Sequence, residues 1–156
     1  MNNKRILLAI SGGIAAYKCA ELVRQFIKQG AEVRVVMTEA AKEFVSPLTL
    51  QALSGSPVRI ALFDRQQEYA MGHIELARWA DFIVIAPATA NIIAKLSYGL
   101  ADDLLTTIFL AAECPVYLAP AMNRVMWHKP VTQQNIQRLK EQGVRVLGPE
   151  AGEQAC

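Results

Sequence analysis

The feature that most constrains the fold is a series of short apolar runs separated by segments with helical periodicity. The runs are rich in valine, isoleucine and leucine and lie at residues 6–10, 33–37, 82–86, 116–119 and 144–147. Continuous apolar strands of this kind are buried on both faces, as in parallel sheets covered by helices. The alternation of strands and helices therefore predicts an α/β fold: a three-layer Rossmann or flavodoxin-like domain with a mostly parallel sheet.

The segments between the strands carry helical patterns. After the first strand, apolar residues from Ala15 to Ile27 recur at helical spacing and end at Gly30, which suits a helix C-terminus. The other helical patterns fall at residues 47–54, 73–80, 89–98, 103–112 and 131–142. Residues 58–63 fit either a further short strand or an irregular excursion, and the sequence leaves both open.

Composition excludes several classes of protein. The 156 residues include 16 Lys and Arg against 14 Asp and Glu, a net charge of +2 that gives no broad attraction to nucleic acid or to an anionic membrane. With 53% hydrophobic and 19% charged residues, the chain is far from disordered in composition. We expect one domain over residues 1–156. Since no apolar run reaches about 18 residues, we expect no membrane partner and a cytoplasmic location.

Three cysteines, Cys19, Cys114 and Cys156, show neither disulfide nor metal-ligand spacing, so no metal site is expected. Cys19 lies on the apolar stripe of the first helix and Cys114 precedes a strand, so both are expected to be small core residues. Cys156 ends a polar segment, where packing gives no reason for a thiol. From its position alone, a stray terminal cysteine is the simple explanation.

The residues that follow the strands are the ones to examine for ligand binding, because ligands of such sheets bind beyond the carboxyl ends of the strands. The first strand is followed by Ser11, Gly12 and Gly13, where two glycines permit a tight turn and expose backbone N–H groups at a helix N-terminus. An ordinary strand-to-helix turn explains this segment equally well on its own. The second strand is followed by Thr38 and Glu39, and a hydroxyl at this place suits a monophosphate better than a dinucleotide.

Two further strand ends are rich in alanine and proline. They read Ala-Pro-Ala-Thr-Ala-Asn at 86–91 and Ala-Pro-Ala-Met-Asn at 119–123. The small residues leave room for a flat ligand, and Thr89 or Asn91 can cap a helix or bond a ligand ring. Capping explains one such loop, but two of them at neighbouring strand ends favour a planar cofactor.

The two histidines lie in different settings. His73 begins a helical segment whose neighbouring residues are apolar, and a histidine on such a face more often packs than catalyses. In a first helical turn, however, the helix dipole favours the neutral imidazole, which keeps a base available. Both roles of His73 stay open. His128 follows Trp127 in a polar, loop-like segment and is expected to be exposed.

Several motifs together define a known pattern. They are Ser-Gly-Gly-Ile-Ala-Ala-Tyr-Lys at 11–18, Met-Thr-Glu-Ala-Ala at 37–41, Gly-His-Ile at 72–74, Ala-Pro-Ala-Thr-Ala-Asn at 86–91, Pro-Ala-Met-Asn at 120–123 and Gly-Glu-Gln-Ala-Cys at 152–156. With them the whole chain resembles the flavin-containing cysteine decarboxylases, most closely the 4′-phosphopantothenoylcysteine decarboxylase domain of the bacterial bifunctional flavoproteins of coenzyme A biosynthesis. Gly-His-Ile and Pro-Ala-Met-Asn at this separation are specific, whereas the glycine turn is not.

The resemblance implies FMN as the cofactor and 4′-phosphopantothenoylcysteine as the substrate. In this family, oxidation of the carbon that bears the substrate thiol lets the carboxylate leave, and reduction of the resulting ene-thiol gives 4′-phosphopantetheine. His73 would be the proton-handling group, Asn123, next to Met122, would bind the substrate carboxylate, and Cys156 would donate the last proton. The implied FMN contacts are Ser11, Gly12, Gly13, Thr38, Ala88, Thr89, Ala90, Asn91 and Ala121.

The resemblance also implies a homo-oligomer, either a trimer or a dodecamer, with FMN at subunit contacts. The chain ends at the cysteine of the family's Ala-Cys-Gly motif, so we expect a domain truncated before a C-terminal ligase domain. Three alternatives share the scaffold: a peptide C-terminal cysteine decarboxylase, a flavin prenyltransferase and a non-enzymatic FMN-binding regulatory subunit. The Gly-rich segment around Cys156 argues against the prenyltransferase, and no acidic tail of the regulatory type is present.

Overall fold

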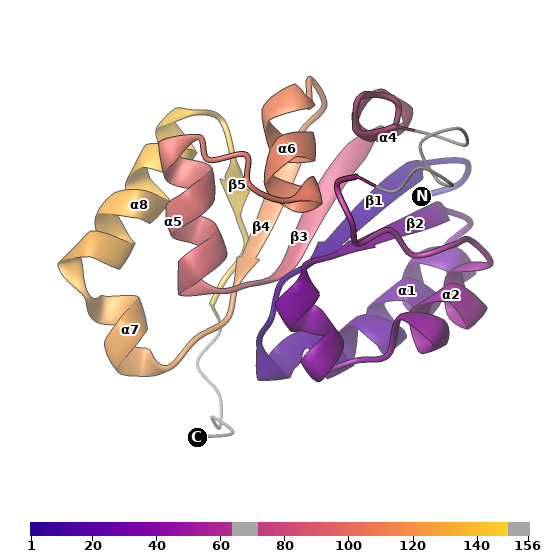
Figure 1. Cartoon of the computed structure of the whole chain (residues 1–156), viewed down its shortest axis with the longest axis horizontal. Coiled ribbons are helices and arrows are strands. Elements are labelled where there is room, and N and C mark those ends of the chain that lie inside the picture. The colour runs from indigo at the N-terminus through magenta and orange to yellow at the C-terminus, as the bar shows by residue number, and fades with distance from the viewer. Residues whose placement is uncertain (64–71, 150–156) are drawn as a thin grey trace.

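Five parallel strands form one sheet in the order β2-β1-β3-β4-β5 in the computed structural model, which describes residues 1–63 and 72–149 (Figure 1). The strands are β1 (Arg5–Ile10), β2 (Glu32–Met37), β3 (Phe82–Ala88), β4 (Val116–Pro120) and β5 (Arg145–Val146). This order is the flavodoxin-like one, which confirms the predicted fold class. The last strand is shorter than the apolar run at 144–147 predicted.

Helices cover both faces of the sheet (Figure 1). One face is covered by the 3₁₀ helix η1 (Ile14–Lys18), α1 (Cys19–Lys28) and α2 (Pro47–Ser54), and the 3₁₀ helix η2 (Glu39–Glu43) follows β2. The other face is covered by α4 (His73–Trp79), α5 (Ala90–Tyr98), α6 (Leu104–Ala111) and α8 (Pro130–Glu141). The short helix α7 (Arg124–His128) precedes α8.

Strand β1 shows why the apolar runs are continuous. Successive side chains of a strand point to opposite faces of its sheet. Accordingly, Ile6, Leu8 and Ile10 belong to the core under α1 and α2, whereas Leu7 and Ala9 belong to the core under the other helices. None of these five side chains is more than 3% exposed. Burial on both faces therefore requires an apolar residue at every position of the strand.

Residues 58–63 are an irregular excursion with one point of pairing. Arg59 bridges Val36 on the outer side of β2: its N–H donates to the carbonyl of Val35 at 3.0 Å, and its carbonyl accepts from the N–H of Met37 at 2.9 Å. This contact covers part of an edge that would otherwise expose unpaired backbone groups. Of the two interpretations that the sequence left open, the excursion is the one observed.

Two helical details differ from the sequence prediction. The segment after β1 begins as a 3₁₀ helix and becomes an α-helix only at Cys19. Residues 124–128, expected to be loop-like around His128, form α7, which is too short for helical periodicity to be recognised. His128 is nevertheless exposed, as expected.

Candidate functional site at the carboxyl edge of the sheet

The candidate site lies where the chain leaves β1 and β3 in opposite directions. The connection from β1 leads to β2 on one side and that from β3 leads to β4 on the other, so these two neighbours form the switch point of the sheet. Parallel sheets bind ligands in the crevice beyond the carboxyl strand ends at this point. In Figure 1 these ends point to the lower part of the view, toward the start of α5 and α7. The strand order thus brings the four predicted strand ends to one edge.

Ser11 joins β1 to the end of β3. Its hydroxyl donates to the carbonyl of Pro87 at 2.6 Å and accepts from the N–H of Thr89 at 3.1 Å. The Ser11 N–H lies 3.3 Å from the same Pro87 carbonyl. Ser11 is only 2% exposed, so the first and third strand ends are held together by a buried side chain.

Gly12 and Gly13 are needed for close approach rather than for a special turn, because neither has a left-handed φ. A Cβ on Gly12 would lie 2.5 Å from the Cβ of Ala40, which no real side chain tolerates. A Cβ on Gly13 would lie 3.2 Å from the methyl carbon of Thr89. The predicted reason for these glycines, a turn that needs glycine, is not the one observed at Gly12, where the close approach of Ala40 excludes a side chain.

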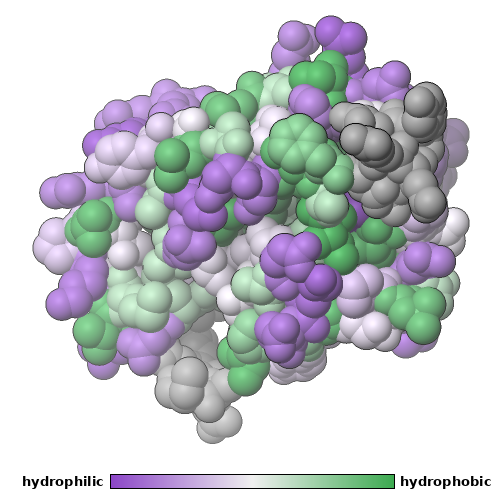
Figure 2. All heavy atoms as spheres, in the orientation of Figure 1, coloured by the Kyte–Doolittle hydropathy of each residue, from purple (hydrophilic) through white to green (hydrophobic). Residues whose placement is uncertain are grey.

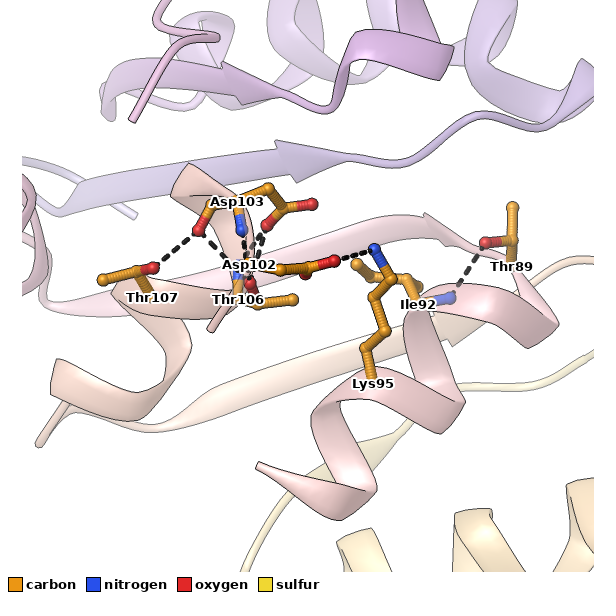
Figure 3. A network of polar contacts seen from close by, with 7 residues as sticks. All are labelled: Thr89, Ile92, Lys95, Asp102, Asp103, Thr106 and Thr107. Carbon is orange, nitrogen blue, oxygen red and sulfur yellow. Dashed lines mark hydrogen bonds and ion pairs between the residues drawn. The ribbon is translucent and has the colours of Figure 1, made fainter. Parts of the chain in front are cut away.

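Two threonines cap helices at this edge. Thr38 begins η2 and accepts the N–H of Ala41 at 3.3 Å. Thr89 begins α5 and accepts the N–H of Ile92 at 3.2 Å (Figure 3). A hydroxyl that accepts one hydrogen bond still carries a proton that it can donate. Both side chains are half-buried, whereas Asn91, the second residue of α5, is exposed.

The end of β4 completes the edge. The N–H of Ala121 donates to the carbonyl of Ala88 at 3.0 Å, so the two alanine-rich ends stay paired past Pro120. Asn123 caps α7, since its Oδ1 accepts the N–H of Val125 at 2.8 Å. This bond leaves the Nδ2 donors of the Asn123 amide available to a ligand. Met122 is partly buried against the core.

His73 lies apart from these residues within one chain. It is the half-buried first residue of α4, whose Leu76 and Ala77 are buried. Helix α4 packs against α6, whereas α7 packs against α8. No hydrogen bond within the described ranges joins His73 to Thr89 or Asn123. The structure therefore brings together the predicted cofactor contacts but not His73 and Asn123.

Two of the three cysteines, Cys19 and Cys114, lie in the hydrophobic core or against it. The Cys19 thiol is buried beneath the edge and donates to the carbonyl of Ala86 at 3.1 Å, and burial raises its pKa to about 12. Burial also raises the pKa of the half-buried Cys114 thiol. Cys19 is thus confirmed as a core residue, and Cys114 packs at the periphery of the core. Cys156 lies outside the described residues.

The residues that the structure describes include neither a candidate metal site nor a candidate membrane span. These residues hold no group of three or more His, Cys, Asp or Glu side chains able to bind a metal ion. Among residues 1–63 and 72–149, no helix is long and apolar enough to cross a membrane.

Residues 1–156 match the family described as Flavoprotein. The chain belongs to the flavoprotein family. This flavoprotein is 59% identical over 153 residues to the coenzyme A biosynthesis bifunctional protein CoaBC of Vibrio parahaemolyticus, a match that covers 98% of the chain. The chain spans 38% of the length of that relative.

Solved structures share the fold of this flavoprotein. A PPC decarboxylase mutant complexed with pantothenoylaminoethenethiol has a TM-score of 0.83 and 35% identity, and the match covers 99% of this chain and 86% of the other. The FMN-dependent cysteine decarboxylase SpaF has a TM-score of 0.87 and 37% identity, with coverage of 96% and 86%. Both likenesses extend over the sheet and the edge described above.

Proposed function

We propose that this flavoprotein binds FMN and decarboxylates 4′-phosphopantothenoylcysteine, with subsequent reduction to 4′-phosphopantetheine, in coenzyme A biosynthesis. The observation that carries the proposal is the convergence of the four motif-bearing strand ends at the switch point of the sheet. The similarity to CoaBC and to a PPC decarboxylase supports the substrate class.

The residues at the edge fit a flavin mononucleotide. The alanines at the strand ends have small side chains that leave space for a flat ring, whereas Gly12 lets the backbone lie against Ala40. The Thr38 and Thr89 hydroxyls have protons to donate to ring or phosphate oxygens. The remaining proposed contacts are Ala88, Ala90, Asn91 and Ala121. FMN, when bound, would supply a hydride acceptor and donor for the oxidation and reduction of the substrate carbon that bears the thiol.

The chain's own residues would bind the substrate and move its protons. Asn123 would donate its Nδ2 hydrogens to the substrate carboxylate, since capping of α7 already fixes its Oδ1. Met122 would pack beside the bound substrate. His73 would take the proton released during oxidation, and Cys156 would return a proton in the reductive step.

A homo-oligomer would complete the site. One chain holds His73 on the α4–α6 pair and Asn123 on the α7–α8 pair, so a neighbouring protomer is needed if both act on one substrate. Apolar side chains next to the proposed cofactor contacts are exposed, and separate apolar areas are visible in Figure 2. The exposed residues are Ile14 at 54%, Tyr17 at 61%, Val125 at 65% and Met126 at 47%. We propose a trimer, alone or within a dodecamer, in the cytoplasm, where thiol substrates stay reduced.

The first test identifies the cofactor and the role of His73. The purified protein should be yellow and should release FMN, not FAD, on denaturation. His73→Asn should keep FMN but slow carbon dioxide release by about 10²–10⁴-fold, because a positioned acid or base typically contributes that much. Recovery of FAD would contradict the cofactor proposal, and near-normal turnover by His73→Asn would return this histidine to a packing role.

Complementation tests the shared site. His73→Asn and Asn123→Asp, each expected to be inactive alone, are co-expressed with different tags, and the mixed oligomer is isolated through both tags. Part of the activity should return, because some interfaces then combine an intact His73 with an intact Asn123. A mixed oligomer as inactive as its parents would contradict a site built from two protomers.

A second candidate shares the chemistry but not the substrate. The structural similarity to EpiD, solved in complex with the substrate peptide DSYTC, favours decarboxylation of a peptide that ends in cysteine. Turnover of 4′-phosphopantothenoylcysteine and of a peptide with a C-terminal cysteine, measured side by side, separates the two functions. We expect the phosphorylated substrate to be strongly preferred.

A further inference from the structure

The hydroxyl of Ser11 has no proton left for a ligand. Its single proton is donated to the Pro87 carbonyl at 2.6 Å, and its oxygen accepts the Thr89 N–H at 3.1 Å. A weaker contact of 3.4 Å reaches the Thr89 hydroxyl. Because Ser11 is 2% exposed, its side chain is enclosed by protein groups. These contacts give Ser11 a role different from that of the half-exposed threonines.

The end of β3 needs this side chain because regular pairing between the strands has ended there, and one long backbone bond, from the Ser11 N–H to the Pro87 carbonyl at 3.3 Å, continues it. Pro87 has no N–H to donate. The register between β3 and β4 also shifts between Ile85 and Ala88, and the pairing between β1 and β3 ends at Ala9 and Ile85. The Ser11 hydroxyl takes the place of a backbone acceptor for the Thr89 N–H. It therefore extends the β1–β3 connection beyond the last paired residues.

Thr89 is thereby held by two hydrogen bonds, and its methyl group lies close to Gly13. Its N–H is bonded to Ser11, its Oγ1 accepts the Ile92 N–H as the cap of α5, and its methyl group lies where a Cβ on Gly13 would be only 3.2 Å away. The position of the Thr89 hydroxyl oxygen is thus set by protein contacts, and its proton can turn toward a ligand. Binding groups that are fixed in advance lose less conformational entropy when the ligand arrives.

We propose that Ser11 is a positioning residue that presets Thr89 and the start of α5 for the cofactor without touching the cofactor itself. The inference rests on the proposed function only in taking FMN as the ligand. It predicts that loss of the Ser11 hydroxyl weakens FMN binding through Thr89, and that the loss is specific to this strand end.

Ser97 supplies the matched control. It is also buried, at 4% exposure, and its hydroxyl oxygen lies 3.0 Å from both the Ala94 carbonyl and Oδ1 of Asn135, two acceptors that share its single proton. These bonds lie between α5 and α8, away from the carboxyl edge. Ser97→Ala therefore removes a comparable buried hydroxyl without disturbing Thr89.

The experiment measures the FMN dissociation constant of flavin-free protein by fluorescence titration, together with the thermal midpoint of each variant. Ser11→Ala should weaken FMN binding by about tenfold or more, the effect of leaving buried polar groups unpaired. Ser97→Ala should lower the thermal midpoint to a similar degree and leave the FMN affinity within about threefold. The double variant Ser11→Ala/Thr89→Ala should bind FMN much less than tenfold more weakly than Thr89→Ala alone. If Ser11 acts through Thr89, the effects of the two substitutions on FMN affinity do not add.

Two outcomes would overturn the inference alone: normal FMN affinity of Ser11→Ala, or full additivity with Thr89→Ala. If Ser11→Ala does not fold, Ser11→Cys replaces it, because a thiol keeps a donor but is a poor acceptor for the Thr89 N–H. Ser11→Cys should also bind FMN less tightly, and unchanged affinity would contradict the inference. If the unsubstituted protein fails to bind FMN, the proposed function falls, and this inference falls with it.

Discussion

At three places on the carboxyl edge, one side chain ends a loop and begins a helix. Thr38, Thr89 and Asn123 each accept a backbone N–H at the first turn of the following helix. Capping uses an acceptor and leaves the donors of the same side chain available. Residues that stabilise the fold can thus also bind a ligand, so their presence in the sequence does not by itself separate the two roles.

Cys19 should be chemically silent in the folded protein. Burial raises the pKa of its thiol to about 12, so the neutral thiol dominates at pH 8, and the reactive thiolate is scarce. Iodoacetamide labelling followed by peptide mass mapping should find Cys19 unmodified in native protein and modified in urea. Because the folded-state pKa lies above the unfolded one, this residue favours the fold below about pH 8.5, and that contribution declines as the pH rises toward 12. Rapid native labelling would contradict its buried position.

Cys156 is predicted to act only in the reductive step. Cys156→Ser should still oxidise and decarboxylate the substrate, because neither step uses this thiol. A serine hydroxyl is a far weaker acid than a thiol with a pKa of about 8.5, so the ene-thiol should accumulate. Mass spectrometry after one turnover should find a product about two mass units lighter than 4′-phosphopantetheine, the difference of two hydrogens. Loss of decarboxylation itself would contradict this division of the reaction.

At the scale of elements, the adjacent carboxylates of Asp102 and Asp103 make different contacts between α5 and α6. Asp103 begins α6 in a capping box: its Oδ1 accepts from the N–H and the hydroxyl of Thr106, both at 2.8 Å, and the Thr106 hydroxyl accepts from the Asp103 N–H at 3.1 Å. Asp102 pairs with Lys95 of α5 at 2.8 Å on the surface. Figure 3 shows both sets of contacts.

These contacts predict unequal effects of the same substitution. Asp103→Ala should lower the free energy of unfolding by about 0.5–2 kcal/mol, the usual effect of losing an N-cap. Asp102→Ala, the matched control, should have a smaller effect, because exposed ion pairs contribute little and are screened by salt. Urea unfolding of both variants, at low and high salt, measures the difference. A larger loss for Asp102→Ala would mean that the ion pair, not the capping box, holds the start of α6.

At the scale of the whole molecule, Arg5 and Asp81 join the starts of two central strands. The Asp81 carboxylate accepts from the Arg5 N–H at 2.8 Å and from its guanidinium at 3.1 Å. The side-chain hydrogen bond from Arg5 is the main cause that lowers the pKa of Asp81. The pair therefore stabilises the fold above the ordinary Asp pKa of about 3.9, and the effect is lost as the pH falls below it.

Asp81→Asn should remove this pH dependence. At pH 7 the variant should unfold at a lower temperature than the unsubstituted protein, because the charged acceptor is lost. At pH 3 the gap should narrow, since the carboxylate is then becoming protonated. Thermal unfolding at intervals between pH 3 and 7 provides the measurement. A gap that stays constant over this range would show that the ionised carboxylate does not contribute.

The sequence by itself determined the strands, most of the helices and the edge that carries the candidate site. Strand periodicity, helix periodicity and capping depend on residues a few positions apart, so they can be recognised in one dimension. Strand ends must meet at one edge of a parallel sheet, which is why Thr38, Thr89 and Asn123 were found together. The five-residue helix α7 was missed because its pattern is too short.

Only the tertiary structure decided which strands are neighbours and how their ends are joined. The Ser11 hydroxyl bonds to the carbonyl of Pro87, 76 residues away, and no local pattern announces such a contact. Gly12 is needed because Ala40 leaves no room for a side chain there. His73 is separated from Asn123 because α4 packs on α6 and α7 packs on α8. No local pattern in the sequence shows either fact. Local hydrogen bonds and periodicity select the elements, whereas contacts between distant segments exist only once the sheet has assembled around its core.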